Sequence, residues 1–346
     1  SERINPGLAV MGIGQGHKAY GRYAKDTGVN PLELLSANVN PSSGGASLNV
    51  ADVIIKKTGR TQKLASTSGS LTQHGRTFAL SVRLADLQKP ATPKKTDLTM
   101  DHFPLTLPLH EGYDPKRDFY PPHQHDSYRW GMVVDLDRCI GCNACSAACY
   151  AENNIGIVGE AQILKGREMA WLRIDRYYDA PLKDGRWGAE VWDGPLDVVE
   201  EPKTLFEPML CQHCEKPPCV DVCPTGASFR RADGIVMVDR HTCIGCRYCM
   251  MACPYNARSF IHENVQFKPT SAPRGKGCVE SCTLCVHRLD NGGTTTACQD
   301  ACKQGAIIFG YLKDPNSAVS QAMARYRNVE IRADLKLNTG VRYTDV

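Results

Sequence analysis

The chain has 346 residues, which is enough for two or three compact units with buried cores. It carries a formal charge of +4 and 17 cysteines, of which 16 fall into four clustered quartets. Clustering in so long a chain argues against a disulfide framework, where chains are short and spacings irregular. The arginines are scattered and not interleaved with aromatic residues, which argues against a nucleic-acid-binding surface. No apolar run approaches the roughly 18 residues of a membrane-spanning helix.

Residues 1–90 contain no cysteine and begin without an initiator Met, an apolar leader or a twin-arginine signal. We therefore expect either a removed leader or a piece of a longer polypeptide. Residues 7–17 predict a buried strand entering a glycine turn, and residues 51–60 predict a second strand. Between them, Asn30 is placed to cap a short helix with Pro31 in its first turn. Such a small mixed segment has too few elements to close a core alone.

The run GQGHKAYGRYA, followed by GVNPLELL and by KKTGR, resembles the end of the dinucleotide-binding domain of molybdopterin oxidoreductases. The residues that would ligate molybdenum are absent. Residues 14–17 are either a structural glycine turn, which we favour, or a remnant of a pterin site.

From residue 91 to residue 127 proline is frequent and periodicity is lost, which predicts an extended linker. His110, His123 and His125 lack the cysteine or carboxylate spacing of a metal site. We interpret them as solvated loop histidines.

Residues 128–139 predict a strand that runs directly into the first cysteine quartet. This quartet has the spacing C-x2-C-x2-C-x3-C at Cys139, Cys142, Cys145 and Cys149. In this bacterial iron–sulfur run three cysteines hold one [4Fe–4S] cube and the fourth serves a neighbouring cube. Gly141 keeps the tight turn that lets backbone N–H groups face the sulfurs. Residues 151–205 lack cysteine and predict a β-hairpin insertion with Asp-Gly turns.

The stretch from Cys211 to Pro254 contains the next two quartets, separated by a hairpin predicted around Asp233-Gly234. In the second quartet four residues, 215–218, separate the second and third cysteines where the run has two, and the third quartet follows the run without deviation. The two quartets are Cys211, Cys214, Cys219 and Cys223, then Cys243, Cys246, Cys249 and Cys253. A tetrahedral zinc site uses two pairs across a loop and has no use for these third and fourth cysteines. The stretch therefore predicts strand–cluster–helix–strand repeated twice, the pseudo-twofold plan of bacterial ferredoxins.

The fourth quartet consists of Cys282, Cys285, Cys298 and Cys302, followed by an exit strand over residues 304–310. Cys278 is the odd cysteine; a spare buried thiol is favoured over a competing ligand. Residues 311–346 predict a helix and an extended tail, the helix having an apolar face of Val319, Ala322, Met323 and Tyr326.

The quartets are expected to pair in a wrapped order. The spacer from Cys223 to Cys243 is that of a self-contained two-cluster ferredoxin, so the first and fourth quartets pair around the central unit. The fourth cysteine of each run serves the other cube. The predicted ligand sets are Cys139, Cys142, Cys145 with Cys302; Cys282, Cys285, Cys298 with Cys149; Cys211, Cys214, Cys219 with Cys253; and Cys243, Cys246, Cys249 with Cys223.

The predicted fold class is therefore α+β: two interleaved dicluster-ferredoxin-like units with insertions, over residues 128–310, holding four [4Fe–4S] clusters. Each oxidised cube with four thiolates carries about −2, so four cubes would shift the formal +4 to about −4. Basic residues beside the cysteine runs are expected to act as internal counter-charge: Arg138, Arg230, Arg231, Arg240, Arg247 and Arg258.

Over residues 128–346 this arrangement resembles the four-cluster electron-transfer subunits of complex iron–sulfur molybdoenzymes. These include the dimethyl sulfoxide, polysulfide and tetrathionate reductases and the iron–sulfur part of alternative complex III. In the last group one quartet has a non-cysteine and builds a [3Fe–4S] centre, whereas all 16 positions here are cysteine.

The resemblance implies a non-catalytic electron-transfer component of a respiratory oxidoreductase. Its partners would be a molybdopterin-type large subunit and a polysulfide-reductase-type integral membrane quinone subunit, with cytochrome c subunits as further candidates. The chain would lie peripherally on a bacterial membrane, the periplasmic face being favoured over the cytoplasmic one. Two alternatives stay open: a freely diffusing polyferredoxin-like carrier, and a structural module whose clusters only hold the fold.

Overall fold

The computed structural model describes residues 8–12, 14–19, 21–35, 39–45, 52–67, 78–79, 129–181, 187–188, 203–263, 275–325 and 328–344. The chain divides into two units, Ser1–Leu64 and Ala65–Val346. The predicted linker over residues 91–127, its three histidines and the expected boundary at residue 90 lie outside the described residues. Within the described ranges, no helix combines the length and the apolar character needed to cross a membrane.

The N-terminal unit contains the short helix α1 (Gly21–Ala24) and the 3-10 turn η1 (Pro31–Leu34). The predicted cap is confirmed, since the Leu32 N–H donates to Oδ1 of Asn30 at 3.2 Å. The chain folds back before this turn, because the Gly16 N–H donates to the Thr27 carbonyl at 3.0 Å.

The two strands predicted in this unit are wrong. Residues 8–12 and 52–60 form no strand, and their apolar side chains are exposed: Val10 is 79% and Ile54 87% exposed. A strand requires a neighbouring strand for its N–H and C=O groups, and an apolar run alone does not provide one.

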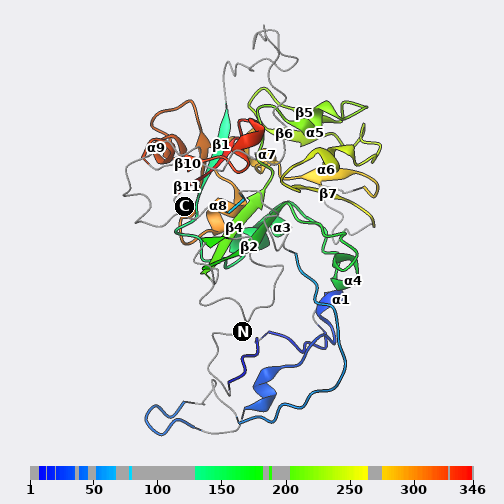
Figure 1. Cartoon of the computed structure of the whole chain (residues 1–346), viewed down its shortest axis with the longest axis vertical. Helices are drawn as coiled ribbons and strands as arrows, with labels where there is room; N and C mark the ends of the chain where they lie inside the picture. Colours follow the sequence, from blue (N-terminus) through cyan, green and yellow to red (C-terminus); the bar gives the residue numbers. More distant parts are fainter. Residues whose placement is uncertain are drawn as a thin grey trace. The chain divides into compact units, whose positions relative to one another are not determined.

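The larger unit consists of short helices and strands joined by the cysteine loops (Figure 1). Its helices are α3 (Ala144–Glu152), α4 (Glu160–Ile163), α5 (Pro218–Asp221), α6 (Tyr248–Ala252), α7 (Val286–Asp290), α8 (Ala297–Ala301), α9 (Ala318–Arg325) and the 3-10 turn η5 (Ala333–Leu335). Its strands are β1 (Trp130–Asp135), β2 (Leu172–Pro181), β3 (Trp187–Gly188), β4 (Lys203–Leu210), β5 (Ser228–Arg230), β6 (Val236–Val238), β7 (Arg258–Phe260), β8 (Val279–Ser281), β9 (Ile307–Tyr311), β10 (Asn328–Val329) and β11 (Val341–Thr344).

Strand β1, which precedes the first quartet, lies in one sheet with strands that follow the fourth quartet. The order is β10-β11-β1-β9, with β1 antiparallel to β9 and parallel to β11. Helix α9 covers this sheet, because Val319 and Ala322 pack against Val133. The sheet therefore holds the two ends of the larger unit together.

The segment expected to be an extended tail is part of the core. It supplies β10 and β11, and Val341 and Tyr343 of β11 are fully buried. The Tyr343 hydroxyl donates to the Pro208 carbonyl at 2.9 Å and accepts from Nε2 of Gln212 at 3.0 Å. The alternation of apolar residues over 341–343 is the pattern of a half-buried strand, and it is this face that packs inward.

The hairpin predicted around Asp233-Gly234 is confirmed, whereas the Asp-Gly turns predicted in the insertion over residues 151–205 lie outside the described residues. Strands β2 and β4 pair antiparallel from Leu172↔Leu210 to Asp179↔Lys203, and the buried end of this hairpin leads into Cys211. Strands β5 and β6 pair antiparallel across the Asp-Gly turn between the second and third quartets. Strand β7, which leaves the third quartet, pairs with β8, which enters the fourth.

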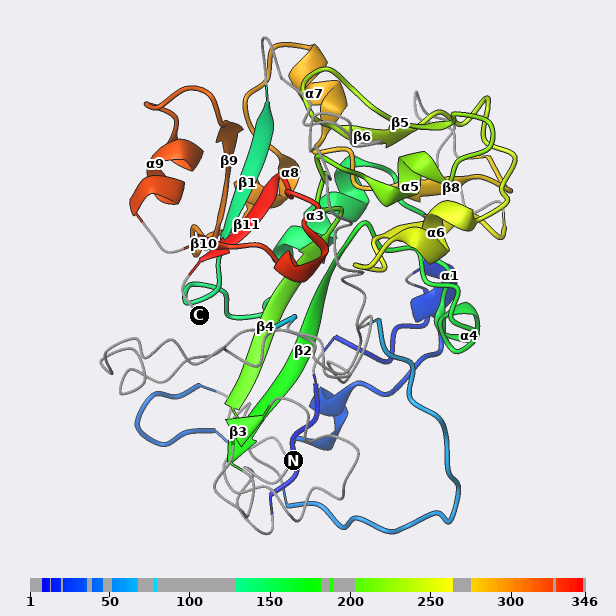
Figure 2. The same cartoon turned by 45° about the horizontal axis from the view of Figure 1, so that its top comes forward.

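Helices that carry or follow cysteines pack in two pairs. Helix α3 of the first quartet contacts α8 of the fourth, and α5 of the second quartet contacts α6 of the third. Both views show α3 beside α8 (Figures 1 and 2). The fold thus brings quartets that are far apart in sequence into adjacent positions.

Candidate functional site: the cysteine groups

All seventeen cysteines lie within the described residues, and none of them forms a disulfide. The predicted ligands are buried or half-buried, with two exceptions. Cys142 of the first quartet and Cys246 of the third are exposed.

The last cysteine of the chain lies with the first quartet. Burial raises the pKa of Cys139, and the neighbouring Cys302 and Cys142 raise it further. Burial likewise raises the pKa of Cys145 to about 12, with contributions from Cys298, Cys139 and Cys302. Two thiols of the first quartet therefore have Cys302 as a neighbour, although more than half of the unit separates them in sequence.

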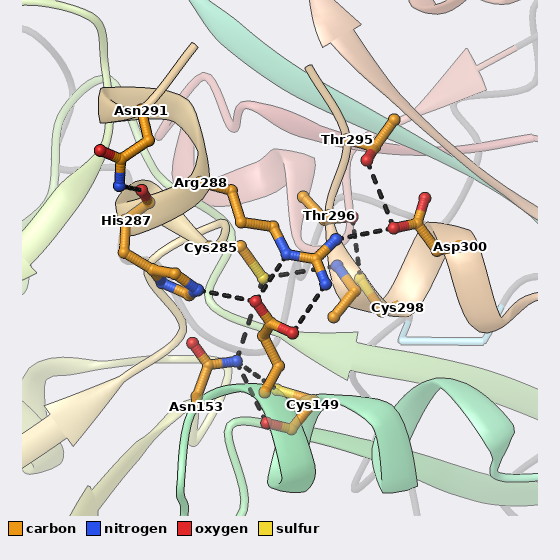
Figure 3. A network of polar contacts seen from close by, with 12 residues as sticks. Cys149, Asn153, Cys285, His287, Arg288, Asn291, Thr295, Thr296, Cys298 and Asp300 are labelled. Atoms are coloured by element: carbon orange, nitrogen blue, oxygen red, sulfur yellow. Dashed lines mark hydrogen bonds and ion pairs between the residues drawn. The ribbon is translucent and has the colours of Figure 1, made fainter. Parts of the chain in front are cut away.

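Cys149 lies against the fourth quartet (Figure 3). The side-chain amide of Asn153 is 3.6 Å from Sγ of Cys149 and 3.9 Å from Sγ of Cys285. Burial raises the pKa of Cys149, and Cys298 and Cys285 add to the rise. Burial also raises the pKa of Cys282 well above its usual value, with Cys149 as its first thiol neighbour.

In the central region Cys253 lies with the second quartet. Burial and the neighbouring Cys219 raise the pKa of Cys211 to about 12, and Cys253 also raises it. The pKa of Cys214 is raised well above its usual value by burial, then by Cys211, Cys219 and Cys253.

Conversely, Cys223 lies with the third quartet. Burial raises the pKa of Cys249, and among the surrounding thiols Cys223 and Cys243 raise it further. The last cysteines of the second and third quartets thus each have thiols of the other quartet as neighbours, as the last cysteines of the first and fourth quartets do.

Backbone geometry around the thiols favours negatively charged sulfur. Backbone N–H groups donate to cysteine sulfurs, from Leu284 to Cys282 at 3.4 Å and from Ser228 to Cys223 at 3.3 Å. The tight turn predicted at Gly141 is present, with φ of 66°. A Cβ there would lie 2.4 Å from Cδ1 of Phe206, so only glycine fits this turn without displacement.

Several buried polar groups around the central thiols lack a partner among the described residues. They are the guanidinium nitrogens of Arg258, Nε2 of His213 and the hydroxyls of Ser228 and Ser281. Buried polar groups are normally satisfied, and buried charges are normally paired. An anionic iron–sulfur cube between the thiolates supplies both acceptor sulfur and negative charge, so these residues fit such a group.

The thiol arrangement also differs from that of a mononuclear site. Within the part of the chain that the structure describes, no three Cys, His, Asp or Glu side chains converge on a single metal position. In a cube each thiolate binds a different iron, so the four sulfurs surround a volume instead of meeting at one point. Bound cubes would supply one-electron chemistry, and the protein would set their potentials through hydrogen bonds, charge and burial.

Comparisons with known proteins agree with this geometry. Two models described as "4Fe-4S dicluster domain" match residues 138–227 and 202–312. The "Hdr-like menaquinol oxidoreductase iron-sulfur subunit 1" of Archaeoglobus fulgidus is 39% identical in an alignment of 251 positions that covers 64% of this chain and 86% of the relative. A tetrathionate reductase subunit of Salmonella typhimurium is 34% identical over 225 residues, which is 64% of this chain and 73% of the relative.

The iron–sulfur subunit of a putative dimethyl sulfoxide reductase from Halobacterium salinarum is 40% identical over 206 residues, which is 57% of this chain and 71% of the relative. The chain belongs to the family of iron–sulfur subunits of respiratory oxidoreductases. As a member of this family it is an electron-transfer component that carries 4Fe-4S dicluster domains.

A polar cluster joins the two outer quartets of this iron–sulfur protein (Figure 3). Glu152 at the end of α3 accepts from Nε and Nη2 of Arg288 in α7, both at 2.6 Å. His287 Nε2 lies 2.8 Å from the same carboxylate, and Arg288 Nη1 lies 2.6 Å from Asp300. Arg288 is the main reason that the pKa of Glu152 falls to about 2. Sequence reasoning missed this cluster, because its partners come from separate parts of the chain.

The expected role of the arginines needs a correction. Three of the six predicted counter-charges form ion pairs with carboxylates: Arg138 with Asp135, Arg230 with Glu215 and Arg231 with Asp290. Arg258, by contrast, faces thiols. That an arginine lies close to a cysteine run in the sequence does not show which carboxylates the fold brings to it.

A buried carboxyl between β2 and β4 was not anticipated. Glu207 in β4 is buried opposite Asp175 in β2, and neither oxygen of Glu207 has a partner within the described residues. Burial raises the pKa of Glu207 well above its usual value, and the nearby Asp175 raises it further, so the surroundings favour the protonated carboxyl. The odd thiol, Cys278, is half-buried and donates to the Arg240 carbonyl at 3.5 Å.

Proposed function

We propose that the chain carries electrons singly along four [4Fe–4S] cubes, between a molybdopterin-type large subunit and a quinone-reactive membrane subunit. The proposed ligand sets are those expected from the spacing: Cys139, Cys142, Cys145 and Cys302; Cys282, Cys285, Cys298 and Cys149; Cys211, Cys214, Cys219 and Cys253; Cys243, Cys246, Cys249 and Cys223. The exchanged positions of Cys149, Cys302, Cys223 and Cys253 support these sets.

The observation that carries the proposal is the series in which the four thiol groups adjoin one another. The ligand set that contains Cys246 lies beside the set that contains Cys211, since Arg258 has thiols of both sets as neighbours. The set that contains Cys211 lies beside the set that contains Cys282. The set of Cys282 lies in turn beside the set that contains Cys139, where Cys298 is a neighbour of Cys145. This series is a route with two distinct ends.

The two ends of the series are also the two places where a predicted ligand is exposed, at Cys246 and at Cys142. Apolar side chains surround these positions: Ile140 is 57%, Ile244 68% and Met251 74% exposed. Exposed apolar side chains beside a redox group suit contact with another protein. An electron-transfer chain needs such a contact at each end, one with the electron donor and one with the acceptor.

The relatives support the assignment of partners. One is named as a menaquinol oxidoreductase subunit, and another, from Nitratidesulfovibrio vulgaris, as the iron–sulfur cluster-binding subunit of a menaquinone reductase. The chain accordingly works as a peripheral part of a membrane-bound complex, on the periplasmic face. The N-terminal segment, with its likeness to a molybdopterin domain, fits a partner of that class.

Anaerobic purification of the natural complex tests this proposal. It should yield a membrane subunit and a large molybdenum-containing subunit together with this chain, which should contain about 16 iron atoms and no stoichiometric zinc, because each run is built for a cube. Recovery of the chain from the soluble fraction without either partner would instead identify a diffusing carrier. Iron that cannot be reduced through the complex would indicate a structural module.

A further inference from the structure

Arg258 is a buried cation whose charge no carboxylate balances within the described residues. It lies five residues after the last cysteine of the third quartet, at the start of β7, opposite Ser281 of β8. Only 3% of the residue is exposed. None of its three guanidinium nitrogens has a nitrogen or oxygen partner, and no ion pair of this arginine occurs, in the part of the chain that the structure describes. The thiol of Cys249 is the side chain that interacts with it as a hydrogen-bonding neighbour.

The groups around this guanidinium are thiols from both sides of the central region. Helix α5 carries Cys219 and helix α6 carries Cys249; the two helices pack together, and α6 contacts β7. The thiols whose negative charge would act on the guanidinium belong to Cys219, Cys211 and Cys249.

In another buried arginine of this fold, both the charge and the hydrogen-bond donors of the guanidinium have partners. Arg173 is 8% exposed and pairs with Asp175, with Nε 2.9 Å from Oδ1. Its remaining nitrogens donate to the carbonyls of Asn256 at 2.8 Å and Tyr255 at 3.0 Å. An arginine stays protonated even when buried, and a buried charge without a partner is strongly destabilising. The negative charge that balances Arg258 must therefore come from the surrounding thiolates and the anionic iron–sulfur cubes that they would bind.

We propose that Arg258 is a fixed cation shared by the two central cubes, where it raises the reduction potentials of both. The inference rests on the proposed ligand sets, in which Cys211 and Cys219 belong to one of these cubes and Cys249 to the other. When an electron passes from a neighbouring cube to a central one, the central cube becomes more negative by one charge. No bond changes and no proton moves; the buried guanidinium stabilises the added electron by Coulomb attraction at low local dielectric.

Arg258 thus acts on the cubes through its charge, by changing their reduction potentials, and is not one of their ligands. Without it the two central cubes would be harder to reduce than they are in the wild-type protein, and the transfer of electrons onto them would be less favourable. Since arginine does not titrate in the accessible range, its effect on the potentials should be the same across neutral pH.

The test uses the complete complex with Arg258→Met, Arg258→Gln and Arg258→Lys, titrated potentiometrically and followed by electron paramagnetic resonance. Removal of the charge should lower the midpoint potentials of two of the four cubes, by at least tenfold in the reduction equilibrium, which is about 59 mV for one electron. Lysine should restore most of this shift. The other two cubes should keep their potentials, and the shift should be equal at pH 6.5 and pH 8.5.

Arg231→Met is the matched control, because Arg231 is half-exposed and already paired with Asp233 and Asp290. It should leave all four potentials unchanged. If a neutral variant at Arg258 retains its full iron content and its potentials, the inference is refuted while the relay stands. If Arg258→Met does not assemble, Arg258→Gln decides: unchanged potentials with the neutral amide would show that a hydrogen bond, and not charge, is what the site requires. A wild-type complex lacking four cubes would instead refute the proposed function itself.

Discussion

Replacement of Glu152 by glutamine tests whether the polar cluster between α3 and α7 holds the outer quartets together. Glu152 receives two bonds from Arg288 at 2.6 Å, and its side chain is 25% exposed. Hydrogen bonds to charged groups contribute about 1.5–3 kcal/mol each when buried, and exposed ion pairs about 0–1 kcal/mol. For this partly exposed pair we expect a loss of about 1–2 kcal/mol, which corresponds to about a 5- to 30-fold change in an equilibrium or rate.

The assay is the half-life of the visible iron–sulfur absorbance in guanidinium, since loss of the clusters makes unfolding irreversible. Glu152→Gln should shorten this half-life about 5- to 30-fold. Asp290→Asn is the control, because Asp290 also pairs with an arginine but is 52% exposed on its side chain. Equal half-lives for wild type and Glu152→Gln would refute the argument that this pair fastens the first quartet to the fourth.

The same pair predicts a dependence on pH. Arg288 depresses the pKa of Glu152 from 4.5 to about 2, so the folded state favours the carboxylate. The stabilisation is therefore complete above about pH 4.5 and is lost as the pH falls from there towards 2. The difference in half-life between wild type and Glu152→Gln should shrink as the pH falls from about 4.5 towards 2.

Two further predictions concern parts of the chain outside the proposed ligand sets. Cys278→Ala should retain all four cubes and the full iron content, because the thiol of Cys278 donates to the Arg240 carbonyl and the four sets are complete without it; loss of about four iron atoms, the content of one cube, would show that it is a ligand. Residues 1–90 expressed alone should show no cooperative thermal transition by circular dichroism, since apolar residues such as Val10 and Ile54 stay exposed and few elements pack together. A sharp two-state transition would show that this segment is a complete domain.

The sequence predicted those features that depend on local spacing. Three features follow from residues close together in the chain: the cysteine runs, the cap at Asn30 and the hairpin at Asp233-Gly234. The structure confirms the cap and the hairpin. The strand preceding Cys139 was also foreseen, because its buried apolar residues stand immediately before the run.

Features that depend on distant partners were not predictable in this way. The apolar residues at 8–11 and 53–55 read as buried strands, but burial requires a neighbouring surface that the pattern does not reveal. Val341 and Tyr343 likewise gave no sign of which strand they would join. Whether an arginine meets a carboxylate, as Arg230 does, or thiols, as Arg258 does, is decided by tertiary packing alone.

The exchange of fourth cysteines between distant quartets is the central claim of this account. Location of the iron atoms by anomalous scattering from crystals of the intact complex, with the nearest sulfur of each iron identified, tests it most directly. The account predicts four cubes, with Cys149 bound to the cube of Cys282, Cys285 and Cys298, and Cys302 bound to the cube of Cys139. Finding Cys149 on the same cube as Cys139 would contradict it.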